Sequence, residues 1–145
     1  MSSTFASLSA GLAQGFPNPV KQQLMEQTIA VLLRYVNQAT PERSGALKRG
    51  NQSEVIMSGN YGRVYNQVPH AIYVHQGTKA HVIRPKGGGV LAFMVGGKMV
   101  FTKRVNHPGT KANPFYERAL QQSEAARSGI LQQAGDAVAT RVVTR

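Results

Sequence analysis

The chain has 145 residues, the length of one ordinary domain, and its 41% hydrophobic and 16% charged residues exclude an intrinsically disordered composition. No apolar run approaches the ~20 residues of a membrane span, the first residues lack a secretory signal, and no cysteine is present to staple a secreted fold, so we expect a soluble protein made in the cytoplasm. The formal net charge of +11 favours an acidic partner, either nucleic acid or a complementary protein surface.

The N-terminal segment and the first helix come next in chain order. Residues 1–15 are rich in Ser, Ala and Gly without a strong period, so we expect a flexible arm outside the core. The remainder, 16–145, is expected to form a single domain. Asn18 and the proline after it are a helix start signal, and Pro41 forbids continuation past its neighbour. The pattern predicts a first helix over about 19–38.

Shorter elements follow that helix. Thr40 and Pro41 give a second start signal, which favours a short helical piece over 43–48. β-Branched and aromatic residues in 53–58 and 63–68, on either side of a glycine-rich turn, predict a strand pair. Residues 71–76 fit a short helical turn closed by Gly77.

The double glycine at 96 and 97 predicts a two-residue hairpin loop, because both residues take positive φ without a Cβ clash. That register makes both faces of the hairpin apolar in its middle. Such a hairpin is either covered by helices on one face and by a neighbouring subunit on the other, or sandwiched within its own fold. The register pairs Phe93 with Val100, Met94 with Met99 and Ala92 with Phe101, and the candidate subunit-interface residues are Phe93, Met94, Met99 and Phe101.

A long C-terminal helix is the last predicted element. Asn113 and Pro114 give another start signal, and an apolar stripe begins at Phe115 and would back the sheet. Gly129 and Gly135 weaken this helix by ~1 kcal/mol each and predict a bend or fraying there. The sum is an α+β fold, an antiparallel β-sheet packed against a long N-terminal and a long C-terminal helix.

Nearly all of the excess charge lies in the middle of the chain. Residues 43–116 hold eleven Lys and Arg against the single acid Glu54. Basic side chains either solvate exposed loops or face an acidic partner, and for this segment we favour a partner, protein or DNA. The candidates are Arg84, Lys86, Lys98, Lys103, Arg104 and Lys111, with protein docking favoured for Arg84, Lys86 and Lys111.

The sequence lacks the ingredients of a catalytic or cofactor site. The histidines at 70, 75 and 81 are spaced five and six apart, unlike a zinc helix, and no cysteine accompanies them. Nuclease chemistry gathers several carboxylates, and Asp136 is the only aspartate for a Ser–His–Asp triad. The glycines at 87–89 lead into a strand rather than a helix, unlike a phosphate loop. We expect no enzyme, no metal and no cofactor.

Two stretches together resemble a known family. They are HAIYVHQGT at 70–78 and HPGTKANPFYERAL at 107–120, with the hairpin between them. In this order and spacing the chain resembles the tail-completion or head–tail joining proteins of long-tailed bacteriophages, over roughly residues 20–125. One departure is His75, where the family commonly has glutamate. The residues that carry the resemblance are Tyr73, Val74, Gly77, Thr78, His107, Pro108, Gly109, Asn113, Pro114 and Phe115.

The resemblance implies a structural virion protein of the neck, with no catalytic residue. Its subunits would assemble into a ring, expected to be a hexamer, that joins the head connector to the tail and surrounds the DNA channel. The implied partners are further copies of the chain and neighbouring connector, tail-tube or tail-terminator proteins, with non-specific contact to genomic DNA and none to a membrane. The alternative that the charge leaves open is a stand-alone basic DNA-binding module.

Overall fold

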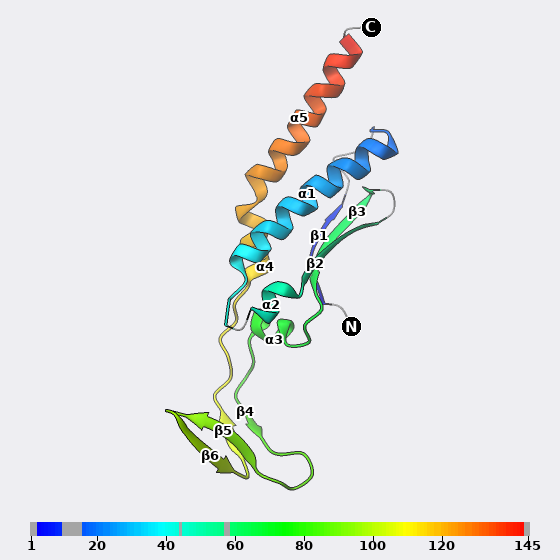
Figure 1. Cartoon of the computed structure of the whole chain (residues 1–145). Coiled ribbons are helices and arrows are strands. Elements are labelled where there is room, and N and C mark those ends of the chain that lie inside the picture. The colour runs from blue at the N-terminus through cyan, green and yellow to red at the C-terminus, as the bar shows by residue number, and fades with distance from the viewer. Residues whose placement is uncertain (1–2, 10–15, 44, 57–58, 144–145) are drawn as a thin grey trace. The chain divides into compact units, whose positions relative to one another are not determined.

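The computed structural model describes residues 3–9, 16–43, 45–56 and 59–143 (Figure 1). Its elements confirm an α+β fold with a long helix near each end, and the chain divides into two compact units. Unit 1 comprises Met1–Ile72 and Pro114–Arg145, and unit 2 is Tyr73–Asn113, where the sequence predicts a single domain. The elements are β1 (Ser3–Ser9), α1 (Asn18–Ala39), α2 (Ala46–Arg49), β2 (Asn51–Ile56), β3 (Tyr61–Asn66), α3 (Ala71–Gln76), β4 (His81–Ile83), β5 (Leu91–Val95), β6 (Lys98–Thr102), β7 (Val105–His107), α4 (Phe115–Gln122) and α5 (Glu124–Val143).

Unit 1 is built on a three-stranded antiparallel sheet in the order β1-β3-β2, with α1 lying along it (Figure 1). The approach of α1 to β3 depends on Gly62, where a Cβ would lie 2.5 Å from Cγ1 of Ile29 and 2.8 Å from Sδ of Met25. The sequence predicts a flexible arm over 1–15. In the structure, β1 lies within this stretch and pairs with β3. Residues 10–15 lie outside the described part of the chain.

The predicted strand pair forms, but each strand begins two residues earlier than expected. A buried polar cluster at one end of the sheet fixes the start of β2 and the end of β3. Nδ2 of Asn66 donates to Oδ1 of Asn51 at 2.7 Å and to the carbonyl of Leu47 at 2.7 Å. The hydroxyl of Tyr116, from α4, donates to the same Oδ1 at 3.1 Å. Asn51, which lies outside the predicted strand, therefore belongs to β2, because its side-chain oxygen accepts from Asn66 and Tyr116.

The helix starts fall near the predicted prolines, but asparagine does not cap them. Pro17 is the N-cap residue of α1 and Pro114 that of α4, and neither helix has a side-chain cap. Asn18 is thus already helical, and Asn113 precedes the cap. The helix predicted over 43–48 is α2, which begins later because Gly45, at φ 69°, sits before it.

The predicted C-terminal helix is two helices, α4 and α5, separated at the buried Ser123. At this junction Arg127 donates to the carbonyl of Leu120 at 2.9 Å and to Oγ of Ser123 at 3.0 Å, satisfying groups that a helix end leaves exposed. Both Gly129 and Gly135 lie within α5, so neither glycine ends the helix. The apolar stripe of α5 faces α1 rather than the sheet.

Unit 2 contains two small antiparallel strand pairs, β5-β6 and β4-β7. The β5-β6 hairpin has the predicted register, and its loop glycines Gly96 and Gly97 have φ of 57° and 81°. The β4-β7 pair was not predicted, since its three-residue strands lie more than twenty residues apart in the chain. The two hairpins expected to share one sheet therefore belong to different units.

Candidate functional site

The two motif stretches meet at the root of unit 2, which we call the base clasp. Thr78 and Thr110 form an isolated antiparallel bridge, with backbone N–H to carbonyl distances of 2.9 and 3.0 Å. The backbone N–H of Asn113 donates to the carbonyls of Val74 and His75, both at 3.1 Å. The clasp joins the segment that enters unit 2 to the segment that leaves it.

Two motif glycines let these backbones approach closely. A Cβ on Gly77 would lie 2.5 Å from the carbonyl oxygen of Thr110 and 2.7 Å from the nitrogen of Ala112, and its φ is 74°. Gly109, at φ 90°, would place a Cβ against the carbonyl of Thr78. Only glycine fits such positions without strain. Gly77 and Gly109 therefore determine the backbone geometry of the clasp and provide no side chain for binding or catalysis.

The other motif residues lie apart from one another. Tyr73 and Pro108 are exposed, whereas Pro114 caps α4 and Phe115 is fully buried in the core of unit 1. Phe115 stacks against Tyr116, with ring centroids 4.4 Å apart. These residues support the fold and do not converge on a site.

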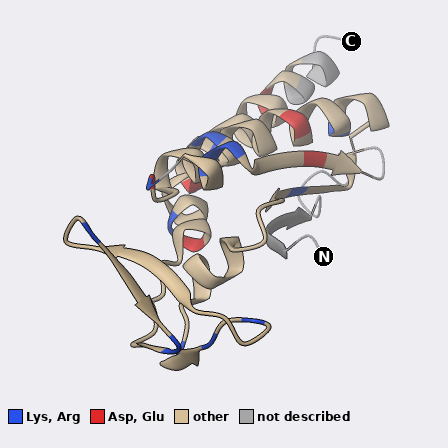
Figure 2. Cartoon of the chain, turned by 60° about the horizontal axis from the view of Figure 1, so that its bottom comes forward, with Lys and Arg blue, Asp and Glu red and all other residues tan. Residues whose placement is uncertain are grey.

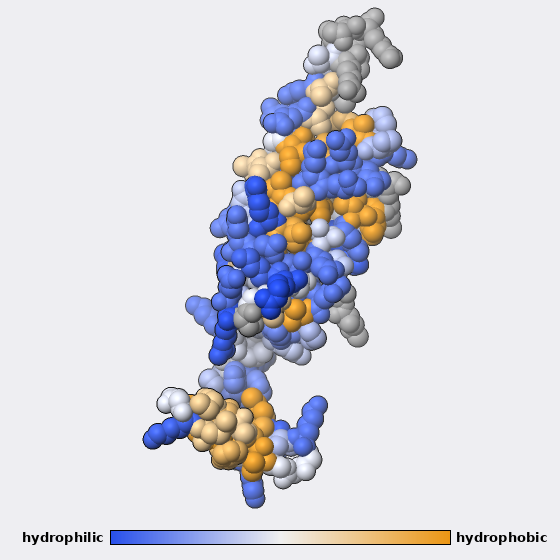
Figure 3. All heavy atoms as spheres, viewed as in Figure 1, coloured by the Kyte–Doolittle hydropathy of each residue, from blue (hydrophilic) through white to orange (hydrophobic). Residues whose placement is uncertain are grey.

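Unit 2 exposes one whole face of its hairpin. Residues paired across an antiparallel ladder share a face, so Met94, Met99 and Phe101 lie together on what we call the outer face. Their exposed fractions are 60%, 55% and 65%. Figure 3 shows hydrophobic residues gathered over this hairpin at the bottom of the view. Of the two arrangements that the sequence leaves open, the hairpin sandwiched within its own fold does not hold for this face.

Phe93, the fourth interface candidate, lies on the opposite, inner face and is 36% exposed. The inner face borders an apolar hollow of about 400 Å³ against the β4-β7 pair. Of the four predicted interface residues, three therefore lie on the outer face and Phe93 lies on the inner face. The hollow is lined by Ile83, Leu91, Ala92, Phe93, Val105 and His107.

By itself unit 2 has no hydrophobic core. From Gln76 to Asn113, a stretch that the structure describes throughout, no residue is buried. Chains of about 40 residues usually need a disulfide, a metal or an oligomeric partner to stay folded, and unit 2 contains no cysteine. An exposed apolar surface on such a unit marks a place where another surface packs.

The charge of unit 2 is entirely positive. It holds seven Lys and Arg and no Asp or Glu, whereas all six acids of the chain lie in unit 1 (Figure 2). Lys98 lies at the hairpin tip, and Lys103 and Arg104 follow β6. The six predicted basic residues, Arg84, Lys86, Lys98, Lys103, Arg104 and Lys111, are all exposed, and Lys79 is a seventh that the prediction missed.

The histidines do not assemble a metal site among the described residues. His81 and His107 pair across β4 and β7 with ring centroids 5.0 Å apart, and Nδ1 of His107 accepts from the backbone N–H of Gly109 at 3.0 Å. His70 is exposed and His75 is buried. No group of three or more His, Cys, Asp or Glu gathers in the part of the chain that the structure describes.

Comparison of the chain with protein-family models, with curated proteins and with solved structures gives no match. Among the described residues, no helix has both the length and the apolar character needed to cross a membrane.

Proposed function

We propose that this chain is a structural subunit from the neck of a long-tailed bacteriophage, one member of a ring that joins the head connector to the tail around the DNA channel. The role is non-enzymatic, and it is performed by surfaces offered to other copies and to neighbouring virion proteins. The family resemblance of the two motif stretches supports the phage assignment, and the base clasp gives those stretches a shared structural purpose.

The outer face of the hairpin is the observation that carries the proposal. Full burial of a large apolar side chain contributes roughly 1.5–3 kcal/mol, so Met94, Met99 and Phe101 together offer several kcal/mol to a contact. Association costs an estimated ~4–15 kcal/mol of translational and rotational freedom, which makes one such contact marginal. A closed ring gives every subunit two contacts, and this favours complete rings over pairs.

The biological test is deletion of the gene from the phage that carries it. Without the protein, negative-stain images are expected to show separate heads and tails, because neither end of the junction has its partner. Complementation with the wild-type gene should restore joined particles. Joined, infectious particles from the deletion strain would contradict the proposal.

A second candidate, a stand-alone DNA-binding module, is favoured by the seven uncompensated cations of unit 2. If all seven contacted phosphates, the logarithm of the duplex affinity would fall with the logarithm of salt concentration at a slope of roughly −6. Fluorescence anisotropy of a labelled duplex at several salt concentrations measures this slope. A ring subunit that only surrounds DNA should instead bind weakly at physiological salt as an isolated chain.

A further inference from the structure

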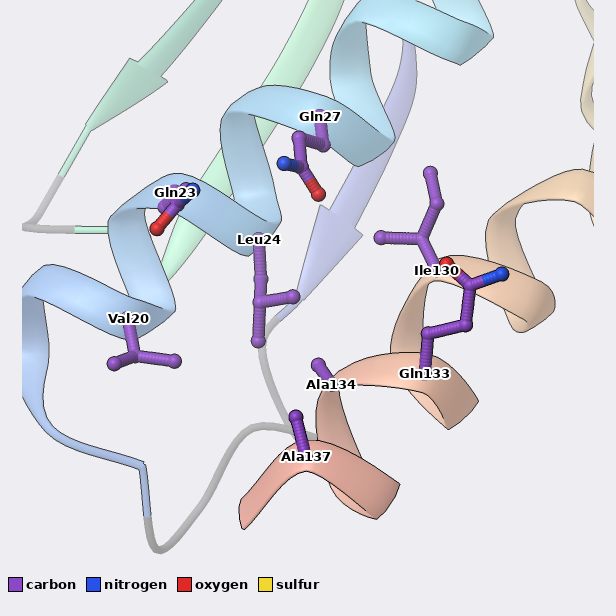
Figure 4. A pocket seen from close by; sticks show the side chains of 8 residues that line it. All are labelled: Val20, Gln23, Leu24, Gln27, Ile130, Gln133, Ala134 and Ala137. Atoms are coloured by element: carbon purple, nitrogen blue, oxygen red, sulfur yellow. The ribbon is translucent and has the colours of Figure 1, made fainter. Parts of the chain in front are cut away.

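Unit 1 carries a groove between α1 and α5, lined by apolar side chains and glutamines, that the described residues of this unit leave open. Its volume is about 320 Å³, and Figure 4 shows its walls, with Val20 and Leu24 projecting from α1 toward side chains of α5. The α5 wall is made of Ile130, Ala134 and Ala137, and glutamines border the groove. In Figure 3 hydrophobic side chains follow the line between these helices. The lining residues are Val20, Gln23, Leu24, Gln27, Ile130, Gln133, Ala134 and Ala137.

We infer that this groove receives the outer face of the β5-β6 hairpin from a neighbouring copy of the chain. The inference rests on the proposed function, since it names the surface that each ring subunit offers to the next. The contact is heterologous, because the hairpin of one copy meets the groove of another, and such contacts form rings when the rotation closes.

The groove is large enough to receive part of the outer face. An apolar cavity of about 150 Å³ holds one benzene ring, so the groove has room for about two side chains of that size. The outer face offers Met94, Met99 and Phe101. Methionine is unbranched and adapts to irregular hollows. On the α5 side of the groove, the small side chains of Ala134 and Ala137 leave space for such a residue.

Charge favours contact of the hairpin with the groove of another copy over contact with the hairpin of another copy. Two copies of unit 2 both carry seven cations without an acid and repel each other. In the groove-lining stretches 20–27 and 130–137 the charged residues are Lys21, Glu26 and Asp136, a net charge of −1 in a chain of +11. Glu26 and Asp136 are exposed on the two helices that form the groove, outside its lining.

The experiment exploits the absence of cysteine, because any disulfide must join introduced residues. Met99→Cys and Ala134→Cys are made in separate full-length chains, one of them carrying a size tag. The two are mixed, allowed to assemble, and either oxidised or treated with a short bis-maleimide. Non-reducing electrophoresis then separates the mixed dimer from the two symmetric dimers. The matched control for Ala134→Cys is Gln132→Cys, on the opposite side of the same helix.

We expect the mixed Met99–Ala134 species to exceed the Met99–Gln132 species at least fivefold. Equal yields, or a predominance of the symmetric Met99 dimer, would overturn the inference. If Met99→Cys disturbs folding, as judged by circular dichroism, Met94→Cys on the same face replaces it. Native mass spectrometry of the same mixtures separates the two failures. Rings without the groove cross-link refute only the groove assignment, whereas monomers at every concentration refute the ring and the groove together.

Discussion

Tyr116 is a buried polar residue that links the core of unit 1 to a cluster of side-chain amides. It is fully buried, and its hydroxyl belongs to the amide cluster of Asn51 and Asn66 at the end of the sheet. Burial raises the pKa of the Tyr116 phenol above its ordinary value, and the side-chain hydrogen bond with Asn66 lowers it by less. The folded chain therefore keeps this proton at pH values where the unfolded chain has lost it.

The sign of the pH effect follows from that direction. The stabilisation is fully present below the unfolded pKa of about 10 and is lost as the pH rises above it, at up to about 1.4 kcal/mol per pH unit. Tyr116→Phe removes the titrating group at a cost near 1 kcal/mol at neutral pH. Urea unfolding between about pH 8 and pH 11 should show the wild-type free energy of unfolding falling more steeply than that of the variant. Parallel curves would contradict this account.

Such a cluster is invisible in the sequence. Asn51 and Asn66 lie fifteen residues apart, and their partner Tyr116 lies another fifty along the chain. The local pattern predicts a strand around Asn66 but leaves Asn51 outside one, and Asn51 becomes a strand residue only through its tertiary contacts with Asn66 and Tyr116.

At the scale of elements, we expect the backbone hydrogen bonds of the base clasp to stabilise the fold of unit 2. Gly77→Ala puts a Cβ against two backbone atoms at a positive φ, which we expect to cost at least ~2 kcal/mol. The loss falls on unit 2, because the clasp residues lie within it. Limited proteolysis should cut the variant faster between Tyr73 and Asn113, with unit 1 cut at the wild-type rate.

The matched control is Gly89→Ala, in the loop before β5, where a Cβ would meet nothing within 4 Å. It should be cut at the wild-type rate. Equal protection of Gly77→Ala and Gly89→Ala would mean that the clasp does not hold unit 2.

The elements that the sequence predicted are those with local causes. The turn and the register of the hairpin at Gly96 and Gly97 were predicted to the residue, because the two glycines fix both. The helix α1 was predicted to within a residue at each end from its prolines and its period. The β4-β7 pair and the meeting of α5 with α1 were missed because each depends on residues distant in the chain, where periodicity carries no information.

The candidate site was predicted in part. The apolar residues of the hairpin were recognised from the register, and the exposed cations from composition. The groove residues Val20 and Leu24, like Ile130 and Ala134, are four residues apart and so share one face of a helix, but this spacing does not reveal whether a partner helix covers that face completely. The separation of Phe93 from Met94 could have been derived from the alternation of side chains along a strand.

At the scale of the whole molecule, the two units differ in their burial of apolar residues and in their charge. Unit 1 has a buried core and all of the acids, whereas unit 2 has an exposed apolar hairpin and cations alone. Because the attraction between such surfaces includes charge, we expect assembly to weaken in high salt, although the apolar contact limits the effect. Sedimentation velocity at low and high salt checks this, and an assembly that strengthens monotonically with salt would exclude the charge contribution.

The most direct test is native mass spectrometry of the purified full-length chain beside the double variant Met99→Glu with Phe101→Glu. The wild-type chain is expected to form one closed species, six subunits in the ring that we propose, and the variant to remain monomeric with unchanged circular dichroism. Lys103→Glu with Arg104→Glu, which alters charge without touching the outer face, should weaken the ring less. A wild-type chain that stays monomeric at high concentration, or a double variant that assembles as well as the wild type, would contradict the account.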